Sequence, residues 1–353
     1  MVTEEEFSLY FHVPFCRHKC PYCHFYVLPN EPAMHALLHE GLMLELEKQK
    51  PLFENKKIVS VYIGGGTPVL FNLDWIPIHG EVTVEANPEE VTYELMSHLK
   101  SIGVNRISIG VQSLDDSSLI TLGRNHSSNR ALEAIETTYR AGIHNISIDL
   151  MYDLPNQTVA SFERTLKRLK ELPITHLSLY NLTIEPHTGF YKQRNSLKLP
   201  SSEESLAMHE MAMELIPLNR YEISAFGLPS IHNSGYWTGR PFLGFGPSAF
   251  SYLEGRRFRN SCNLRSYVSN LKGGTPWIDF EETLDKEASL RERLAIHLRL
   301  IEGVHLSSFD PLPPSVIKDI NDLVSEGYLK EDSSLKLTER GLLFYDEVAS
   351  RLI

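Results

Sequence analysis

Three closely spaced cysteines are the residues of this sequence with the clearest chemistry. Cys16, Cys20 and Cys23 are separated by three and by two residues, whereas the fourth cysteine, Cys262, lies far along the chain. Thiolates this close together can converge on a metal when the backbone loops around it. Four cysteines in a reducing compartment are not typical of a disulfide framework. The cysteines therefore predict a metal site.

Three kinds of metal group would use these thiolates. A zinc site needs four ligands, and His24 or a distant residue could supply the fourth. Covalent haem attachment uses Cys-x-x-Cys-His, which Cys20–His24 matches, but that attachment normally takes place outside the cytoplasm. A [4Fe–4S] cluster on three thiolates leaves one iron open for another ligand.

The wider sequence resembles the radical-SAM superfamily and, within it, the coproporphyrinogen dehydrogenase-like branch. The cysteine spacing, with Tyr22 before the last cysteine, is similar to the motif of that superfamily. Further segments follow in the order of the branch: Ser8–Cys16, Ile63–Pro68, Val84–Pro88, Gly110–Ser113, Leu122–Arg124 and Ile148–Pro155. The resemblance implies a [4Fe–4S] cluster on the three cysteines, with S-adenosylmethionine at the open iron.

The resemblance also implies where S-adenosylmethionine would bind. Gly65, Gly66 and Thr67 follow the second predicted strand, and glycine lets backbone amides come close to the methionine amino group and carboxylate. A planar arginine fork suits a carboxylate. Residues implied to contact the adenosine or methionine parts are Glu85, Gln112, Arg124 and Asp149, and those implied to flank the cluster and adenine are Tyr10 and Tyr22.

Two subfamilies of this branch belong to different functional classes. Oxygen-independent coproporphyrinogen III dehydrogenases carry a further cysteine two residues after the cluster motif, where this chain has Phe25. His232–Trp237 matches the HNxxYW signature of HemW-type haem chaperones, in which the histidine is linked to haem binding. Leu182–Pro186 and Tyr221–Ser224 also resemble segments of those chaperones. The resemblance implies a haem chaperone, with the dehydrogenase as the alternative.

His232 has two interpretations when the resemblance is set aside. Imidazole is a good iron ligand, and Tyr236 with Trp237 could stack on a porphyrin face. A loop histidine beside an aromatic pair is, however, more often a packing feature. A haem ligand also needs an apolar slot, and nearby residues that could form one are Phe242, Phe245 and Phe250.

The segments that position these residues alternate between β-rich runs and stretches of helical apolar spacing. Repeated βα units predict a parallel sheet, and six or more predict a barrel or partial barrel with its functional groups on the loops after the strands. We expect an α/β fold with a partial (β/α)6-type barrel. The predicted strands are Ser8–Val13, Val59–Ile63, Glu81–Ala86, Arg106–Val111, Asn145–Met151, His176–Leu182 and Tyr221–Ser224, and the predicted helices are Met34–Lys48, Thr92–Ile102, Asn129–Ala141 and Ser161–Leu172.

Strand parity predicts which side chains face inward. In Arg106–Val111 and Asn145–Met151, apolar residues alternate with small or polar residues. A period of two puts the apolar set against the helices and turns the other set inward. Gln112 and Asp149 would then point into the barrel mouth, although for Asp149 capping of the next helix is an equal alternative.

The C-terminal part has a different pattern. Helices at Leu290–Leu300 and Pro314–Glu326, a hairpin at Tyr328–Leu337 and a helix at Thr338–Leu352 predict a small winged-helix-like α+β domain. This segment lacks the basic surface that DNA binding requires, so we expect packing or docking. We divide the chain into a barrel (1–225), an extension with the HNxxYW motif (226–284) and this C-terminal domain (285–353).

Two features depart from the family pattern. The connection from Pro68 to Glu81 is too short for the helix that normally links the second and third strands. Relatives commonly have a histidine where this chain has Phe250, so a haem site here would be weaker or differently ligated.

The bulk composition limits the partners. The net charge is −11 and no Lys/Arg stripe occurs, the short run Arg256–Arg259 being interpreted as a solvated turn, so we expect no nucleic-acid partner. No apolar run reaches the roughly 18 residues of a membrane span, and the acidic start Met1–Glu6 is not typical of a signal peptide. We predict a cytoplasmic protein. The resemblance implies haem, a haem-acceptor protein, an electron donor such as a flavodoxin or ferredoxin, and peripheral membrane contact through an acceptor.

Overall fold

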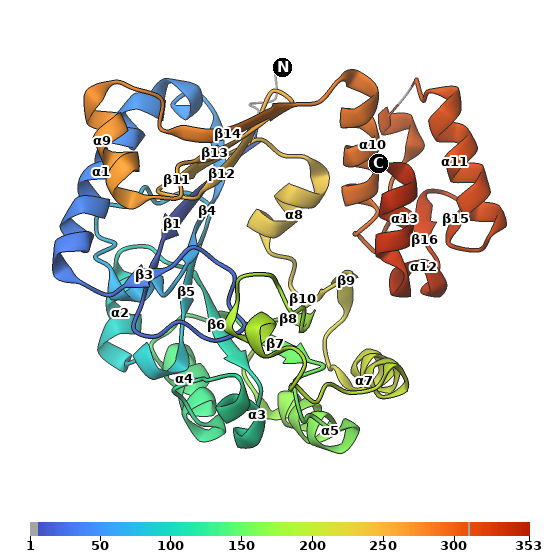
Figure 1. Cartoon of the computed structure of the whole chain (residues 1–353), viewed down its shortest axis with the longest axis horizontal. Coiled ribbons are helices and arrows are strands. Elements are labelled where there is room, and N and C mark those ends of the chain that lie inside the picture. The colour runs from blue at the N-terminus through green and yellow to red at the C-terminus, as the bar shows by residue number, and fades with distance from the viewer. Residues whose placement is uncertain (1–5, 310) are drawn as a thin grey trace.

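The computed structural model describes residues 6–309 and 311–353. The described residues form one large curved sheet of twelve strands, in the order β14-β13-β12-β11-β1-β4-β5-β6-β7-β8-β10-β9 (Figure 1). The sheet ends at β14 on one side and at β9 on the other, so the predicted partial barrel is confirmed. Residues 1–5 lie outside the described part of the chain, and so does most of the acidic start Met1–Glu6.

Six parallel strands form the barrel wall, and all six were predicted. The seventh predicted strand is different, because β9 (Arg220–Glu222) pairs antiparallel with β10 (Ala225–Gly227), which is itself antiparallel to β8. The predicted strand Tyr221–Ser224 therefore lies at the outer edge of the sheet and does not add a further βα unit. The six strands are β1 (Glu6–Val13), β4 (Lys57–Gly65), β5 (Glu81–Ala86), β6 (Arg106–Gln112), β7 (Asn145–Tyr152) and β8 (His176–Asn181).

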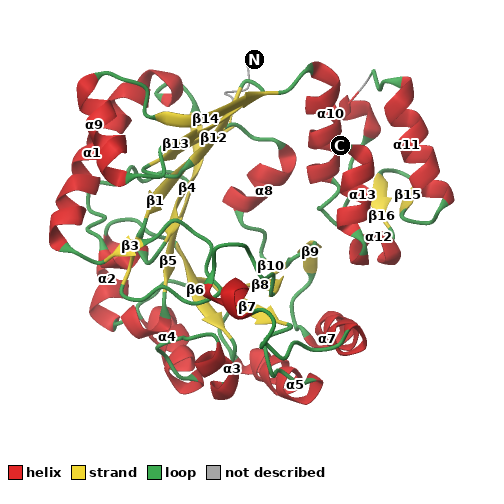
Figure 2. Ribbon diagram, in the orientation of Figure 1, coloured by secondary structure: helices red, strands yellow, loops and turns green. Residues whose placement is uncertain are grey.

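Helices cover the outer side of the curved sheet (Figure 2). Side-chain caps set several of their starts: Ser127, Thr158 and Ser201 each accept a hydrogen bond from a backbone amide of the first turn. The helix after Ser201 was not predicted, although its Ser201–Glu204 capping box is a start signal. The helices are α1 (Pro32–Phe53), α2 (Tyr93–Ser101), α3 (Asp116–Thr121), α4 (Ser128–Arg140), α5 (Val159–Arg168), α6 (Gly189–Gln193) and α7 (Ser202–Leu215).

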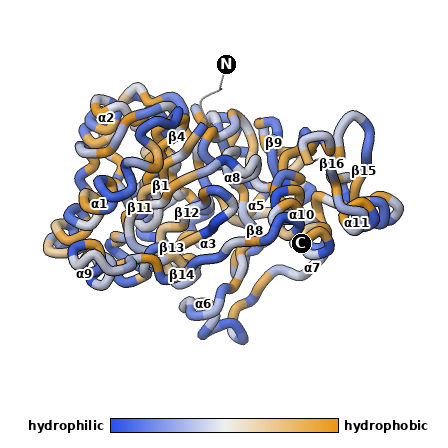
Figure 3. Tube along the Cα trace, turned by 90° about the horizontal axis from the view of Figure 1, so that it is seen from above, coloured by the Kyte–Doolittle hydropathy of each residue, from blue (hydrophilic) through white to orange (hydrophobic). Residues whose placement is uncertain are grey.

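The predicted alternation along β6 and β7 is confirmed. Ile107, Ile109, Ile146 and Ile148 are fully buried in the hydrophobic core between sheet and helices. Figure 3 shows apolar residues gathered around β1, whereas the segment near α6 is hydrophilic. Apolar burial on one face leaves the other face of the strands for polar side chains.

The connection between β4 and β5 is as short as expected. All its residues are described, and its helical content is the 3-10 turn Pro68–Leu70 (η1). Trp75 from this connection packs its ring edge-on against Phe11 at 5.5 Å and helps to cover β1 where a helix would otherwise lie.

The sheet continues beyond β1 into the predicted extension, whose strands were not predicted. β11 (Phe242–Phe245) is parallel to β1, and an antiparallel meander of β12 (Phe250–Leu253), β13 (Arg256–Asn260) and β14 (Ile278–Thr283) follows, with α9 (Leu264–Gly273) packed on α1. The interpretation of Arg256–Arg259 as a turn was wrong. These arginines lie on β13, and each forms an ion pair with an acidic residue of the neighbouring strand β14. Arg256 pairs with Glu281, Arg257 with Glu282 and Arg259 with Asp279.

The C-terminal residues form a second, smaller hydrophobic core. The predicted order is found, except that the last helix is broken at Phe344. The predicted division at 225/226 falls within β10, and the main core includes residues from both sides of it, so the three-domain division stays a prediction. The elements are α10 (Lys286–His297), η4 (Leu306–Phe309), α11 (Pro314–Ser325), β15 (Leu329–Glu331), β16 (Leu335–Leu337), α12 (Glu339–Leu343) and α13 (Tyr345–Leu352). Across the described residues, no helix is long and apolar enough to cross a membrane.

Candidate functional site

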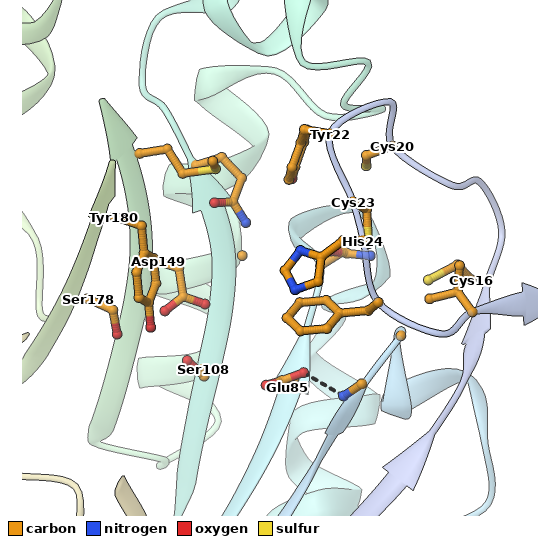
Figure 4. Close-up of a pocket in the computed structure, with 18 of the residues that line it drawn as sticks. Cys16, Cys20, Tyr22, Cys23, His24, Glu85, Ser108, Asp149, Ser178 and Tyr180 are labelled. Atoms are coloured by element: carbon orange, nitrogen blue, oxygen red, sulfur yellow. Dashed lines mark hydrogen bonds between the residues drawn. The ribbon is translucent and has the colours of Figure 1, made fainter. Parts of the chain in front are cut away.

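A cavity of about 490 Å³ lies at the carboxyl ends of the parallel strands, where a barrel of this class places its functional groups. Figure 4 shows Cys16, Cys20 and Cys23 on one wall and Asp149, Ser178 and Tyr180 on the opposite wall, with Glu85 between them. All of the residues predicted for the cluster and cofactor line this cavity except Tyr10, Thr67 and His232.

Cys16 ends the short strand β2 (Phe15–Cys16), and Cys20 and Cys23 lie on the loop between β2 and the parallel strand β3 (Leu28–Pro29). A turn bond from the amide of Cys23 to the carbonyl of Cys20, at 3.1 Å, folds the loop back. Two protein groups donate to the sulfurs: Thr67 Oγ1 to Cys16 Sγ and Arg124 Nη1 to Cys20 Sγ, both at 3.6 Å. Donors of this kind stabilise thiolate charge and tune a bound cluster.

The donor set fits a three-thiolate cluster. The thiols share one cavity wall beside a buried arginine, and burial raises the pKa of Cys16 and Cys23 while they carry no metal. Within residues 6–309 and 311–353, no three His, Cys, Asp or Glu side chains stand close enough to hold a single metal ion. This finding covers Cys16, Cys20 and Cys23 as well, so it does not distinguish a cluster from zinc.

The glycine-rich loop after β4 makes close backbone contacts, although not those we expected. Gly65 has a φ of +113°, and a Cβ on Gly66 would lie 2.6 Å from the carbonyl oxygen of Phe15. The amide of Gly65 donates to Glu85 Oε2 at 3.0 Å. The amide of Gly66 donates to the carbonyl of Val13, and the amide of Thr67 donates to the carbonyl of Phe15. In this structure these amides tie the loop to β1 and β5, and the ligand-binding role stays a prediction.

Two buried carboxyl groups line the deep part of the cavity. Burial raises the pKa of Glu85 to about 7 and that of Asp149 to about 6, against the opposing effect of their hydrogen-bond donors. Tyr62 donates to Glu85 at 2.8 Å, and hydroxyls of Ser178 and Ser108 bond Asp149. Asp149 therefore points into the barrel, as the parity argument favoured, and does not cap the following helix.

Arg124 connects the cysteine loop to the barrel. Its Nη2 donates to Asn87 Oδ1 at 2.7 Å and to the carbonyl of Gly110 at 2.9 Å. Its Nε is buried without a hydrogen-bond partner among the described residues. Gln112 lines the same wall with a φ of +63°, at an irregularity in the β6–β7 register that turns the strand end towards the cavity.

Arg106 is a cavity residue that sequence reasoning missed. It is 1% exposed, donates to Thr83 Oγ1 at 3.5 Å, and its Nε has no partner within the described chain. Arg106 has the same strand parity as Ser108, Gly110 and Gln112, so the period of two could have identified it. Further polar residues of the cavity that were missed are Tyr62, Asn87, Tyr180 and Asn181.

Tyr10 and Tyr22, predicted as a pair, lie in different places. Tyr22 is on the cavity wall, where burial raises its pKa. Tyr10 is on β1 behind the cavity, with its hydroxyl 2.9 Å from His12 Nδ1 and its ring stacked on Tyr62.

His232 lies in helix α8 (Ile231–Thr238) and not in a loop. Its side chain is 1% exposed, Nδ1 is 2.9 Å from Ser60 Oγ, and Nε2 is 2.8 Å from Tyr236 Oη. Burial lowers the pKa of His232 to about 3, so the ring is neutral. The predicted iron ligand is thus a buried, fully hydrogen-bonded group in this structure.

The three phenylalanines suggested for a haem slot do not face one space. Phe245 is fully buried and stacks on Phe11 at 4.9 Å, whereas Phe242 contacts the ring of Tyr236. Phe250 is exposed on β12, next to Phe280.

Comparison with known proteins identifies the family. Residues 10–169 match the family model of the radical SAM superfamily. The haem chaperone HemW of Lactococcus lactis is 32% identical over 98% of this chain and 97% of its own length, and that of Bacillus subtilis is 34% identical over 97% of each. This chain belongs to the HemW family of radical SAM proteins.

The fold agrees with this membership. Coproporphyrinogen III oxidase (HemN) of Escherichia coli, a radical SAM enzyme, superposes with a TM-score of 0.85 over 99% of this chain and 90% of its own, at 22% identity. That likeness shows a shared fold. As a radical SAM protein of the HemW family, the chain has a [4Fe–4S] cluster and S-adenosylmethionine as its cofactors.

Proposed function

We propose that this protein is a haem chaperone, which binds haem beside its [4Fe–4S] cluster and S-adenosylmethionine and transfers the haem to an acceptor protein. The observation that carries the proposal is the full-length similarity to HemW haem chaperones of several bacteria. The HNxxYW sequence at His232–Trp237 and Phe25 in place of a fourth cluster-region cysteine support it.

Cys16, Cys20 and Cys23 would hold the cluster, with Thr67 and Arg124 donating to two of the sulfurs. When bound and reduced, the cluster would supply an electron for reductive chemistry on S-adenosylmethionine. Glu85 and Asp149 offer acceptors to the polar parts of this ligand, and Arg124 offers a cation to its carboxylate.

A second candidate is oxygen-independent coproporphyrinogen III dehydrogenase, because HemN shares the fold over almost the whole chain. The rim of the cavity argues against it. Phe25 is 54% exposed there, and its side chain offers no thiol to a cluster or substrate.

Partners and location remain at the level of prediction. We propose a flavodoxin- or ferredoxin-like electron donor, membrane contact only through a haem acceptor, and a cytoplasmic location. We also retain the division into a barrel, a motif-bearing extension and a C-terminal domain.

The deciding experiment combines two assays on anaerobically reconstituted protein. We expect haemin to produce a bound-haem absorption band, and coproporphyrinogen with reductant to give no doubly decarboxylated product. Formation of that product without stable haem binding would favour the dehydrogenase and contradict the chaperone.

A further inference from the structure

The residues of the HNxxYW motif lie on two faces of helix α8. One face contacts the curved sheet, and the other contacts the C-terminal part of the chain. Figure 1 shows α8 between the curved sheet and α10, and it contacts both β4 and α10. His232 and Tyr236, four residues apart, face the sheet together, as residues at this spacing do on a helix. Trp237 is turned towards Arg299, which follows α10.

Both ring nitrogens of His232 have hydrogen-bond partners. Nδ1 lies 2.9 Å from Ser60 Oγ, which is itself 2.8 Å from Ser8 Oγ, and Nε2 lies 2.8 Å from Tyr236 Oη. A neutral imidazole has one donor and one acceptor nitrogen, and hydroxyl partners can serve either tautomer. Neither nitrogen is therefore free to bind iron, and Tyr236 occupies Nε2.

The start of α8 is fixed to the sheet by a buried carboxylate. Glu81 Oε1 accepts from Ser230 Oγ and from the amide of His232, both at 3.1 Å. A negative group at a helix N-terminus is favourable. The ring of Tyr62 lies against His232, 5.0 Å between centroids, and separates it from the cofactor cavity.

The other face of α8 is held by an arginine from the C-terminal part of the chain. The guanidinium of Arg299 lies over the Trp237 ring at 4.3 Å and over Tyr345 at 5.3 Å, and it pairs with Glu222 at 3.1 Å. Trp237 Nε1 is buried and has no hydrogen-bond partner among the described residues. Helix α8 is thus held on both sides, and the indole N–H of Trp237 is left without a hydrogen-bond acceptor among the described residues.

We propose that α8 is a displaceable helix that masks the haem ligand, and that haem binds His232 only after the Tyr236 hydrogen bond breaks and the Arg299 contact opens. The inference rests on the proposed haem-chaperone function and assigns a regulation to its ligand. It follows because a planar macrocycle cannot reach an imidazole that is 1% exposed and bonded through both nitrogens. Asn233 of the same helix lines the cofactor cavity, so displacement of α8 also changes that cavity.

The test is a haemin titration of the reconstituted full-length protein, followed by its absorption band. Tyr236→Phe removes the competing hydroxyl and keeps the ring, so we expect haem to bind about five- to tenfold more tightly, the worth of one hydrogen bond. His232→Asn should weaken binding at least tenfold, as expected when a ligand is lost.

The chain offers a matched control for the histidine variant. His176 on β8 is also fully buried, bonded to Ser147 Oγ at 2.8 Å and to Tyr221 Oη at 3.0 Å. His176→Asn should disturb folding in a similar way and leave haem affinity unchanged. A loss of haem affinity in His176→Asn equal to that in His232→Asn would overturn the masking inference.

Hydrogen exchange gives a second readout. Addition of haemin should increase exchange at the amides of residues 231–240, because the helix leaves its site. The masking inference would be overturned if exchange there were unchanged or slower and Tyr236→Phe bound haem no more tightly than the wild-type protein. Haem binding that still depended on His232 would support the chaperone in that case. Failure of the wild-type protein to bind haemin would overturn both proposals.

Discussion

Two buried polar regions of this molecule differ in how completely their groups are satisfied. The cofactor cavity contains Arg106 and Arg124, each with a buried Nε that has no partner in the described chain, and carboxyl groups whose pKa burial raises. Around His232, whose ring lies against the cavity residue Tyr62, the imidazole has partners on both nitrogens. Unsatisfied buried groups are costly, whereas a completed network is stable.

This difference indicates which region is built to receive a ligand directly. The cavity gains hydrogen bonds when a charged, polar molecule enters it. The network around His232 loses hydrogen bonds when a ligand takes the imidazole. S-adenosylmethionine should therefore bind to the structure as it stands, and haem should bind after a rearrangement.

The largest expected effect is at the cysteine loop, which defines the first region. Cys20→Ala should abolish the reconstituted cluster, because three thiolates are the minimum that holds it. Iron and sulfide content and visible absorption measure the loss. Cys262→Ala is the matched control, since Cys262 lies outside the cavity, 3.6 Å from Ser248 Oγ, and should keep the full cluster. Retention of a full cluster in Cys20→Ala would refute the assignment.

A smaller effect is expected for ligand affinity in the cavity. Glu85→Gln should weaken S-adenosylmethionine binding about tenfold or more, the scale of a hydrogen bond to a charged group. Calorimetry on the reconstituted protein measures it, with the exposed Glu281→Gln on β14 as control. Equal affinities of both variants would show that Glu85 does not contact the ligand.

The two regions should also respond oppositely to acid. His232 has a pKa of about 3 when folded and 6.5 as a free group, so between pH 7 and 5 the unfolded chain takes up the proton and stability falls by about 2 kcal/mol. Glu85, with a pKa raised from 4.5 to about 7, takes up its proton in the folded state, and stability rises by about as much.

Variants separate these two contributions. From pH 7 to 5, Glu85→Gln should lose stability more steeply than the wild-type protein, and His232→Asn less steeply. Urea unfolding of the metal-free proteins at both pH values measures the free energy of unfolding. Identical pH dependence in all three proteins would contradict the burial of these groups.

The smallest effect is expected outside both regions, at the position where relatives commonly have histidine. Phe250 is 42% exposed, so Phe250→Ser should change the free energy of unfolding by about 0.5 kcal/mol or less. It should also leave haem affinity unchanged, because the Phe250 ring contacts Phe280 and Arg259 of the meander. A marked loss of haem affinity would instead place a haem contact on β12.

The barrel and most of its mouth could be predicted because their signals are local. Period-two alternation located β6 and β7, and it correctly turned Gln112 and Asp149 inward. The short connection after Pro68 was evident from its length alone. Arg106 has the same parity, so the same alternation could also have placed it in the cavity.

The rest depended on contacts between distant segments. Ser60, Tyr236 and Glu81 come together around His232 from β4, α8 and β5, and nothing in the motif itself shows that its histidine is buried. The strand character of Arg256–Arg259 likewise depends on acidic partners some twenty residues later, on β14. Tertiary pairing overrides local preference at such places.

The most direct test of the central claim is electron paramagnetic resonance of the reduced, reconstituted protein before and after S-adenosylmethionine is added. A cluster held by three cysteines beside an open cavity should give a signal that shifts on addition, with the shift much reduced in Glu85→Gln. A cluster signal that does not respond to S-adenosylmethionine in the wild-type protein would contradict the account.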